Sequence, residues 1–296
     1  MINPCGGRNF PGTGPGAIFL CALLWSTSGL CIKLIPWPPM AIAGGRSFLA
    51  VLLFLVIRAL RPPAQPFDRR SVPACLAGGA AYAATMISFV IANKYSSPAN
   101  VILLQYSAPV WAALLGWLLI KEKLRWKHWL ALFMALGGLI LFFKDGLADG
   151  LSGASFFGDS LALFSGLCFG ANSVFMRMQK EGNPADSMFI AHILTALCSI
   201  PFFILQPPAL NLPNGLGILY MGFIQIGAAS LLFSYGIKRV SAVQSMLIAA
   251  IEPVLNPLWV LLVTGEIPSL AALAGGGVII AAVLVSALPE KKPVSG

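Results

Sequence analysis

Ten long apolar segments dominate this sequence and restrict it to few folds. Each holds about 20 mostly apolar residues, the length that a helix needs to cross a bilayer core. The runs are continuous rather than alternating, which argues against the strands of a membrane β-barrel. The sequence therefore predicts an all-α integral membrane protein. Its predicted spans are 16–34, 39–58, 71–93, 97–120, 126–143, 158–177, 187–206, 213–236, 242–264 and 268–288.

The composition supports lipid as the solvent of this chain. Hydrophobic residues make up 58% and charged residues 10%, and the mean hydropathy is +0.85, whereas soluble domains carry about 25% charged residues. The net charge of +9 would suggest a nucleic-acid partner in a soluble protein. Here the basic residues lie in short loops, so no nucleic acid is expected. The six cysteines form no CxxC pair and are interpreted as small buried hydrophobes, so neither a metal nor a cofactor is predicted.

The distribution of Lys and Arg predicts the orientation. Fifteen of the 19 lie on the side that holds the N-terminus, three lie on the other side, and Arg46 lies inside a span. Cytoplasmic loops carry the excess of basic residues. Both termini are therefore expected in the cytoplasm, which requires an even number of spans. The expected location is the cell membrane, taken as a bacterial inner membrane.

A shift of 144 residues reveals an internal repeat. The aligned pairs are Trp25 with Phe169, Lys33 with Arg177, Phe89 with Phe233, Ser97 with Ser241, Pro109 with Pro253, and Glu122 with Glu266. The repeated unit holds five spans, an odd number, so the second copy must enter the membrane from the opposite side. Inverted repeats of this kind are typical of secondary transporters.

The repeat defines the predicted domain organisation. Residues 16–145 form the first five-helix unit and residues 156–288 the second. A disordered N-terminal segment, 1–15, and a short tail, 289–296, are both placed in the cytoplasm.

Several short motifs resemble a known family. They are Leu24-Trp25-Ser26 with Lys33, Arg46, Pro109 followed by Trp111 to Glu122, Ile251-Glu252-Pro253-Val254, and Gly265-Glu266. With these motifs the chain resembles the drug/metabolite transporter superfamily, EamA-like family, from about Gly16 to Leu288. It departs from the family pattern at two positions. The family usually has a Gly before the Glu, where this chain has Lys121, and commonly has a Gly after the Trp, where this chain has Ser26. The resemblance implies two inverted five-helix repeats around a central cavity, and transport of amino acids, nucleosides, drugs or other metabolites.

Two charged residues inside spans are the leading candidates for a site. A carboxylate at the middle of a span, as at Glu252, must face a cavity or a partner. It is interpreted as a proton carrier or as the partner of a substrate amine; a structural ion pair or a protonated, hydrogen-bonded Glu is the alternative. The Arg46 guanidinium could bind a substrate carboxylate bidentately, pair with Glu252, or extend towards the interface.

Weaker candidates surround these two charges. His192 could titrate near neutrality or simply pack in its helix. Pro109, Pro253 and Pro257 are predicted to interrupt helix hydrogen bonding. The kinks would place polar side chains near a cavity, and packing is the alternative for each residue. The remaining candidates are Gln105, Tyr106, Asn256, Trp25 and Asn172, with Tyr82 and Gln225 as further lining.

The sequence favours a secondary transporter of a small organic metabolite, operating as an exporter by alternating access. It contains no G-x-x-x-x-G-K-[ST] loop for ATP. An intramembrane enzyme and a non-transporting membrane scaffold are the alternatives. Small-molecule substrate and lipid are the expected partners, with protons as a candidate coupling ion; the substrate and the oligomeric state stay open.

Overall fold

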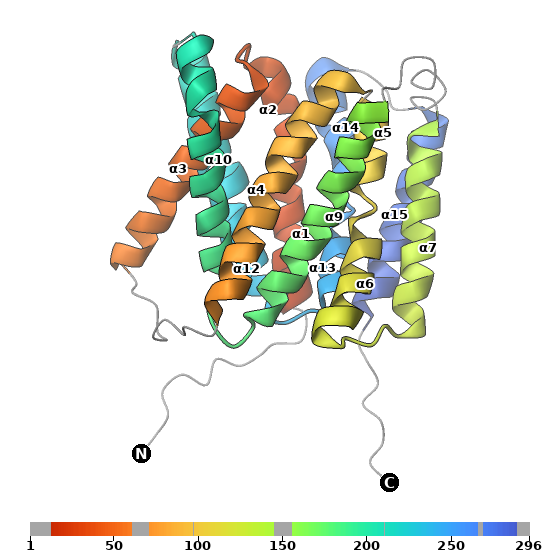
Figure 1. Cartoon of the computed structure of the whole chain (residues 1–296). Helices are drawn as coiled ribbons and strands as arrows, with labels where there is room; N and C mark the ends of the chain where they lie inside the picture. Colours follow the sequence, from red (N-terminus) through yellow and green to blue (C-terminus); the bar gives the residue numbers. More distant parts are fainter. Residues whose placement is uncertain are drawn as a thin grey trace.

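The computed structural model describes residues 13–60, 71–96, 98–144, 156–209, 211–265 and 269–288. Every regular element within these ranges is a helix (Figure 1). The first half contains α1 (Thr13–Ser26), α2 (Ser28–Leu34), α3 (Pro39–Leu60), α4 (Val72–Tyr95), α5 (Pro98–Gln105), α6 (Ala108–Ile120) and α7 (Trp126–Phe142). The second half contains α9 (Phe156–Met178), α10 (Ala185–Leu205), α11 (Leu212–Tyr220), the π-helix η2 (Met221–Ala228), α12 (Ala229–Ile237), α13 (Ala242–Ala249), α14 (Glu252–Thr264) and α15 (Leu270–Ala287).

These helices lie on the predicted apolar segments. Among the described residues, seven helical stretches are long and apolar enough to cross a membrane: 39–60, 72–93, 101–120, 156–178, 185–205, 212–237 and 270–287. Three shorter apolar stretches are Thr13–Ser26, Trp126–Phe142 and Ala242–Leu255. The all-helical, multi-pass membrane architecture is thus confirmed. α1 begins at Thr13, slightly before its predicted start, and the predicted tail at 289–296 lies outside the described residues.

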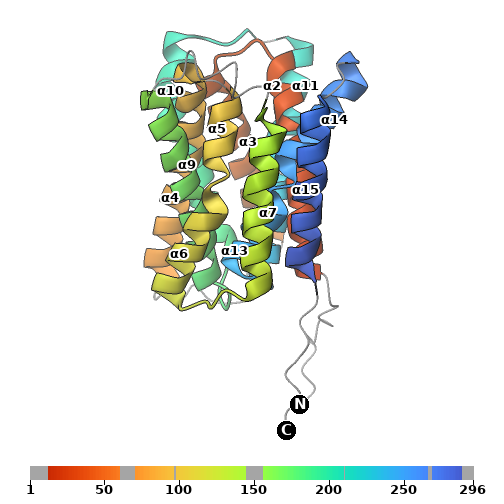
Figure 2. The same cartoon turned by 90° about the vertical axis from the view of Figure 1, so that its right-hand side faces the viewer.

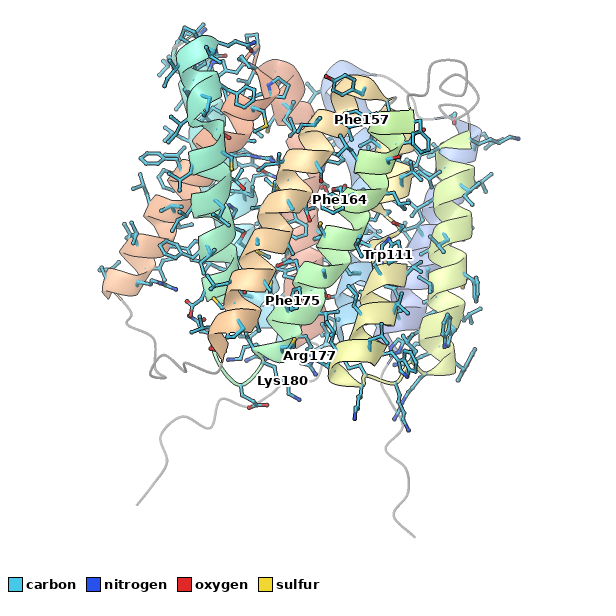
Figure 3. All side chains as sticks on the ribbon, in the orientation of Figure 1. Trp111, Phe157, Phe164, Phe175, Arg177 and Lys180 are labelled. Carbon is cyan, nitrogen blue, oxygen red and sulfur yellow. The ribbon has the colours of Figure 1, made fainter. Side chains whose placement is uncertain are left out.

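The outer surface of the bundle is apolar, as lipid requires. Phe156, Leu60, Leu262 and Leu284 are among the large hydrophobic side chains that are more than half exposed. Water would penalise such a surface, whereas lipid tails do not. Figure 3 shows side chains projecting from the outer faces of the helices, among them the exposed Phe157 and Phe164 of α9.

Two helices are broken near their middle, each just before a proline. α5 ends at Gln105 and α6 begins at Ala108; α13 ends at Ala249 and α14 begins at Glu252. Pro109 and Pro253 occupy the second position of the new helix, where a missing N–H costs little and the fixed φ fits. The breaks therefore lie where the sequence predicted kinks at these two prolines. α14 continues as a helix through position 257.

The boundaries of these broken helices repeat at the same offset as the sequence. Both bounds of α13 lie 144 residues after those of α5, and both bounds of α14 lie 144 residues after those of α6. Each pair ends on a left-handed residue, Lys121 at φ 53° and Gly265 at φ 76°. Position 265 carries glycine, which tolerates this left-handed conformation without steric cost. α5 and α14 lie at one end of the bundle and α6 and α13 at the other (Figure 1).

Small residues allow the helices to approach closely. A Cβ atom added to Gly170 of α9 would lie 2.7 Å from the Ala108 carbonyl oxygen and 2.8 Å from the Ala112 nitrogen of α6. α7 and α15 lie side by side in the same manner (Figure 2), and the ammonium of Lys127 donates to the Leu288 carbonyl at 2.8 Å. Such contacts are the usual basis of helix association in lipid.

Candidate functional site

Four aromatic rings from four helices meet in the core. Trp25 of α1 lies 5.6 Å from Phe233 of α12, 5.9 Å from Phe169 of α9 and 6.4 Å from Tyr82 of α4, measured between ring centroids. All four side chains are buried. We call these four residues the aromatic box. Offset and tilted arrangements of this kind are the favourable geometries for packed aromatic rings.

Glu252 lies beside this box at the start of α14. Its Oε2 accepts a hydrogen bond from the Tyr106 hydroxyl at 2.9 Å. The same hydroxyl lies 3.5 Å from the Ala249 carbonyl oxygen, one of the groups that the α13–α14 break leaves without a helical partner. Glu252 is partly buried. The predicted candidates Tyr106 and Glu252 are thus in direct contact.

Arg46 of α3 approaches the site from the other side. The residue is 9% exposed, and its Nη2 lies 3.9 Å from the Met86 sulfur, which is a weak acceptor. Within the described residues, its Nε has no hydrogen-bond partner. Arg46 interacts electrostatically with Glu252 and Tyr82. The ion pairs of the described chain, however, join Arg58 to Asp186 and Arg177 to Glu122, so Arg46 and Glu252 are neighbours without being an ion pair.

His192 of α10 is a third titratable residue at this site. Its Nε2 lies 2.9 Å from the Ser230 hydroxyl, and its ring meets Tyr82 edge-on at 6.1 Å. Phe54 covers another side at 6.1 Å. Its Nδ1 is buried and, in the part of the chain that the structure describes, unpaired. His192 is therefore next to the aromatic box, held by one hydrogen bond.

Further polar atoms at this site are buried without partners. Within the described ranges these are the Trp25 Nε1, both side-chain amide atoms of Asn172, and the Gln225 Oε1, whose amide nitrogen donates to the Trp25 carbonyl at 3.4 Å. Asn172 is fully buried. An unpaired polar group in a membrane interior costs several kcal/mol. Water or a polar ligand must therefore satisfy these atoms.

The other predicted candidates lie outside the aromatic box. Gln105 donates to the Ser165 hydroxyl at 3.0 Å, and Ser165 in turn donates to the Thr85 carbonyl at 3.1 Å. This chain of bonds ties α5, α9 and α4 together. Pro109 and Pro253 are buried. The side chains of Asn256 and Pro257 lie outside the described residues.

A second polar cluster closes one end of the bundle. Arg177, near the end of α9 (Figure 3), donates from Nε to Glu122 Oε1 at 3.0 Å and from Nη1 to the carbonyls of Ile237 and Lys238 at 3.0 and 2.7 Å. Glu122 Oε2 accepts from the Ala242 backbone N–H at 3.1 Å. These bonds fasten α9 to the ends of α6 and α12 and to the start of α13. We call this arrangement the Arg177 clasp.

The aromatic box is closed in this conformation. Its residues and the neighbouring His192, Asn172 and Gln225 are each at most 7% exposed. A surface hollow over α11 shares no residue with them; its lining is Asn211, Leu212, Gly215, Leu216 and Leu219. The aromatic box with His192, Asn172 and Gln225 thus forms an occluded centre rather than an open cleft, and Glu252 beside it is partly exposed.

The sequence pattern of the EamA-like transporter family matches residues 12–144 and again residues 156–288. The chain belongs to this family. Each match covers one of the two halves that share the 144-residue offset. This agrees with the resemblance carried by the motifs around Trp25, Pro109 and Pro253.

Relatives of this EamA-like protein bear transporter names. It is 28% identical to an uncharacterized transporter of Archaeoglobus fulgidus over 92% of this chain and 96% of that protein. It is 30% identical to the uncharacterized transporter YwfM of Bacillus subtilis over 63% of each chain, and 27% identical to YyaM of the same bacterium over 57% of each. The match thus spans under two thirds of these two Bacillus proteins. A crystal structure with 22% identity shares the fold with a TM-score of 0.77, over 94% of this chain and 97% of the other.

Several site residues of this EamA-like chain were not singled out from sequence as site residues. They are Phe169, Phe233, Ser230 and Met86. A usable signal was present, since the repeat aligns Trp25 with Phe169 and these two rings touch. In an inverted repeat, two equivalent positions come close to each other only near the symmetry axis at the centre of the bundle. Two aromatic residues that are 144 positions apart therefore indicate the centre.

Proposed function

We propose that this protein is a secondary active transporter that exports a small organic metabolite by alternating access. The observation that carries the proposal is the occluded centre itself. Among the described residues, buried polar atoms without partners come from α1, α3, α9, α10 and η2, hence from both halves of the chain. A closed polar site between two halves is what a carrier needs while it holds its substrate away from both sides of the membrane.

We propose ten membrane spans in two inverted five-helix repeats, 16–145 and 156–288. In this arrangement α1 with α2, α5 with α6, α11 with η2 and α12, and α13 with α14 each act as one crossing. The equal offsets of the broken helices support it, as does the placement of α5 and α13 at opposite ends of the bundle. Five spans per unit place equivalent helices in opposite directions.

We place the protein in the cell membrane, a bacterial inner membrane, with both termini in the cytoplasm. The bias of Lys and Arg towards one side supports this orientation. Arg177 and Lys180 lie at the same end of the bundle (Figure 3), the end assigned to the cytoplasm.

Glu252 is the proposed coupling group. Its carboxylate lies beside the occluded centre, held by one hydroxyl and without an ion-pair partner among the described residues. Such a group can gain or lose a proton as its surroundings change between the two states. A proton gradient would then drive the uphill movement of substrate.

The test is flux through reconstituted protein. Sealed liposomes that contain the full chain are loaded with amino acids, nucleosides or cationic drugs. The movement of labelled compound is then followed with and without a pH gradient. We expect exchange of one class, lost in Asn172→Leu, which removes the unpaired amide at similar volume. Protein-free liposomes are the control. A scaffold would exchange nothing in the whole screen, and an enzyme would convert a compound instead of moving it; either result rejects the proposal.

A further inference from the structure

We infer that the turn between α6 and α7, together with the start of α7, is a binding surface for an anionic phospholipid. The surface has two adjoining parts, and it is independent of what the protein transports. The first part, the basic turn, is residues 121–125 with the cations Lys121, Lys123 and Arg125; the second, the aromatic stripe, is Trp126, Trp129 and Phe133 of α7.

Exposed and covered residues alternate along the basic turn. Lys121, Lys123 and Arg125 are exposed, whereas Glu122 and Leu124 between them are partly buried. Glu122 belongs to the Arg177 clasp, and Leu124 packs against the core. Within the described ranges, the ammonium groups of Lys121 and Lys123 form no hydrogen bond or ion pair. The covered residues therefore hold the turn in place, and the three cations lie on its outer side.

Lys121 adopts a backbone conformation that is unusual for lysine. Its φ of 53° lies in the left-handed region, where a residue with a Cβ atom is strained and glycine is not. The equivalent residue of the second half is Gly265, which is also left-handed, at φ 76°. The backbone therefore favours glycine at this helix end, and a lysine there indicates that its charge has a use.

The equivalent helix end in the second half carries no cation. At the 144-residue offset the three cations correspond to Gly265, Ile267 and Ser269, although α14 ends as α6 does. An excess of basic residues in a loop sets the orientation of a membrane protein wherever those residues lie within the loop. Orientation alone therefore does not account for a lysine at the left-handed position.

The aromatic stripe places a lipid-facing surface directly beside the cations. Trp126 is the first residue of α7 and is 75% exposed, and Trp129 and Phe133 are also exposed. Their spacing of three and four residues puts them on one face of the helix, and the rings of Trp129 and Phe133 stack with centroids 6.3 Å apart. Tryptophan is enriched at the level of the lipid headgroups. The basic turn therefore lies where the phosphate of a phospholipid would lie.

Charge selects an anionic lipid as the occupant of this surface. The acidic residue of the basic turn, Glu122, is paired with Arg177, so it does not compensate the exposed cations. Basic residues next to a membrane span attract anionic headgroups. A soluble acidic partner would match the cations but not the aromatic stripe. The turn lies at the same end of the bundle as Arg177 and Lys180 (Figure 3), so the lipid belongs to the leaflet on that side.

Lipid binding to the purified full chain tests this surface. Protein in a neutral detergent is titrated with phosphatidylglycerol or with phosphatidylcholine of the same acyl chains, and bound lipid is counted by native mass spectrometry. We expect phosphatidylglycerol to bind more tightly, by roughly fivefold for each cation that contacts its headgroup. The preference should shrink as salt is added, because salt screens exposed charges. Equal binding of the two lipids would overturn the assignment.

Lys121→Gly separates lipid binding from a structural role. It removes the charge and introduces the residue that suits the backbone, so the variant should melt at or above the parental temperature with phosphatidylcholine. Its affinity for phosphatidylglycerol should fall about fivefold, and that of the double variant with Lys123→Gln roughly 25-fold. Lys180→Gln, which removes an exposed cation at the same end of the bundle, should bind like the parent.

Two results would reject the surface. Parental binding of phosphatidylglycerol by the double variant would show that these cations do not contact the lipid. An equal loss of affinity in Lys180→Gln would show that the lipid responds to net charge at this end of the bundle and not to the basic turn.

Discussion

Tyr106 and Glu252 connect the two broken helices of this protein through one hydrogen bond of 2.9 Å. Tyr106 follows directly after α5, within the first break, and Glu252 is the first residue of α14, directly after the second. Breaks that the repeat relates are thus in contact at the centre. The bond is therefore a direct link between the two breaks.

Tyr106→Phe tests this connection. The change removes the only hydroxyl donor recorded for the described Glu252 and keeps the ring. A hydrogen bond to a charged group contributes about 1.5–3 kcal/mol, so we expect a lower unfolding temperature in detergent and slower substrate exchange. Tyr95→Phe is the control, because Tyr95 is exposed and keeps its ring contact with Phe157. Equal behaviour of the two variants would show that the bond has no role.

Glu252→Gln separates coupling from structure. The amide keeps the size of the side chain and removes its charge. We expect this variant to fold and to exchange substrate at saturating concentration, but to lose accumulation driven by a pH gradient. Glu181→Gln, at an exposed position, should accumulate substrate like the parent. Accumulation by Glu252→Gln at the parental level would exclude Glu252 as the proton carrier.

The Arg177 clasp should contribute strongly to stability. Arg177→Met leaves the Oε1 atom of Glu122 and two helix-end carbonyls without the Arg177 donor, while Oε2 keeps its bond from the Ala242 N–H. Removing one partner of a buried pair typically costs about 3–5 kcal/mol; the partial exposure of Arg177 and Glu122 lowers the expected loss to about 1–3 kcal/mol. Lys180→Met removes an exposed cation one turn later and should melt like the parent. If Arg177→Met and Lys180→Met melt at the same temperature, the structural role of the clasp is contradicted.

The contact of α7 with α15 depends on one glycine of a glycine triplet. A Cβ atom on Gly275 would lie 2.5 Å from the Gly138 carbonyl oxygen and collide with the Phe142 nitrogen, whereas a Cβ atom on Gly277 meets nothing within 4 Å. Gly275→Ala should therefore destabilise by roughly 1–3 kcal/mol. Gly277→Ala should be neutral or stabilising by up to about 1 kcal/mol, because alanine favours helix. Thermal unfolding in detergent measures both, and a reversed order would refute the packing.

The orientation of the chain has a direct test as well. A reporter fused after Gly296 should be active only as a cytoplasmic marker, because the basic residues favour that side for both termini. A fusion inserted in the 145–155 segment should report from the opposite side. Activity of the C-terminal fusion outside the cytoplasm would overturn the proposed even number of spans.

Much of the fold could be predicted from sequence because lipid imposes simple rules. Span length and apolarity place helices such as α3 and α10 within a few residues, and the proline positions place the breaks before Pro109 and Pro253. The break at Thr27 and the π-helix η2 carry no comparable signal. Both depend on contacts between distant helices, such as the hydroxyls of Thr27 and Tyr220 at 3.1 Å.

The candidate site was only partly predictable for the same reason. A charge inside a span, as at Glu252 or Arg46, is costly enough to indicate a site by itself. Gln105 is polar but uncharged, and its side chain forms a link between helices. The glycine triplet shows the same limit, because an added Cβ atom would collide at Gly275 and would meet nothing within 4 Å at Gly277. Which face of a helix meets its neighbours is decided by tertiary packing.

The 144-residue offset has a thermodynamic consequence under the proposed inverted symmetry. Two identical copies would make the inward-open and outward-open arrangements degenerate, each populated equally without substrate. The counterparts of Arg46 and Glu252 at this offset are Ile190 and Ala108, so both charges break that degeneracy. The resting protein then has a preferred side, set by differences of a few kcal/mol between its two halves, and the positions where the copies have diverged decide which side of the membrane the empty site faces.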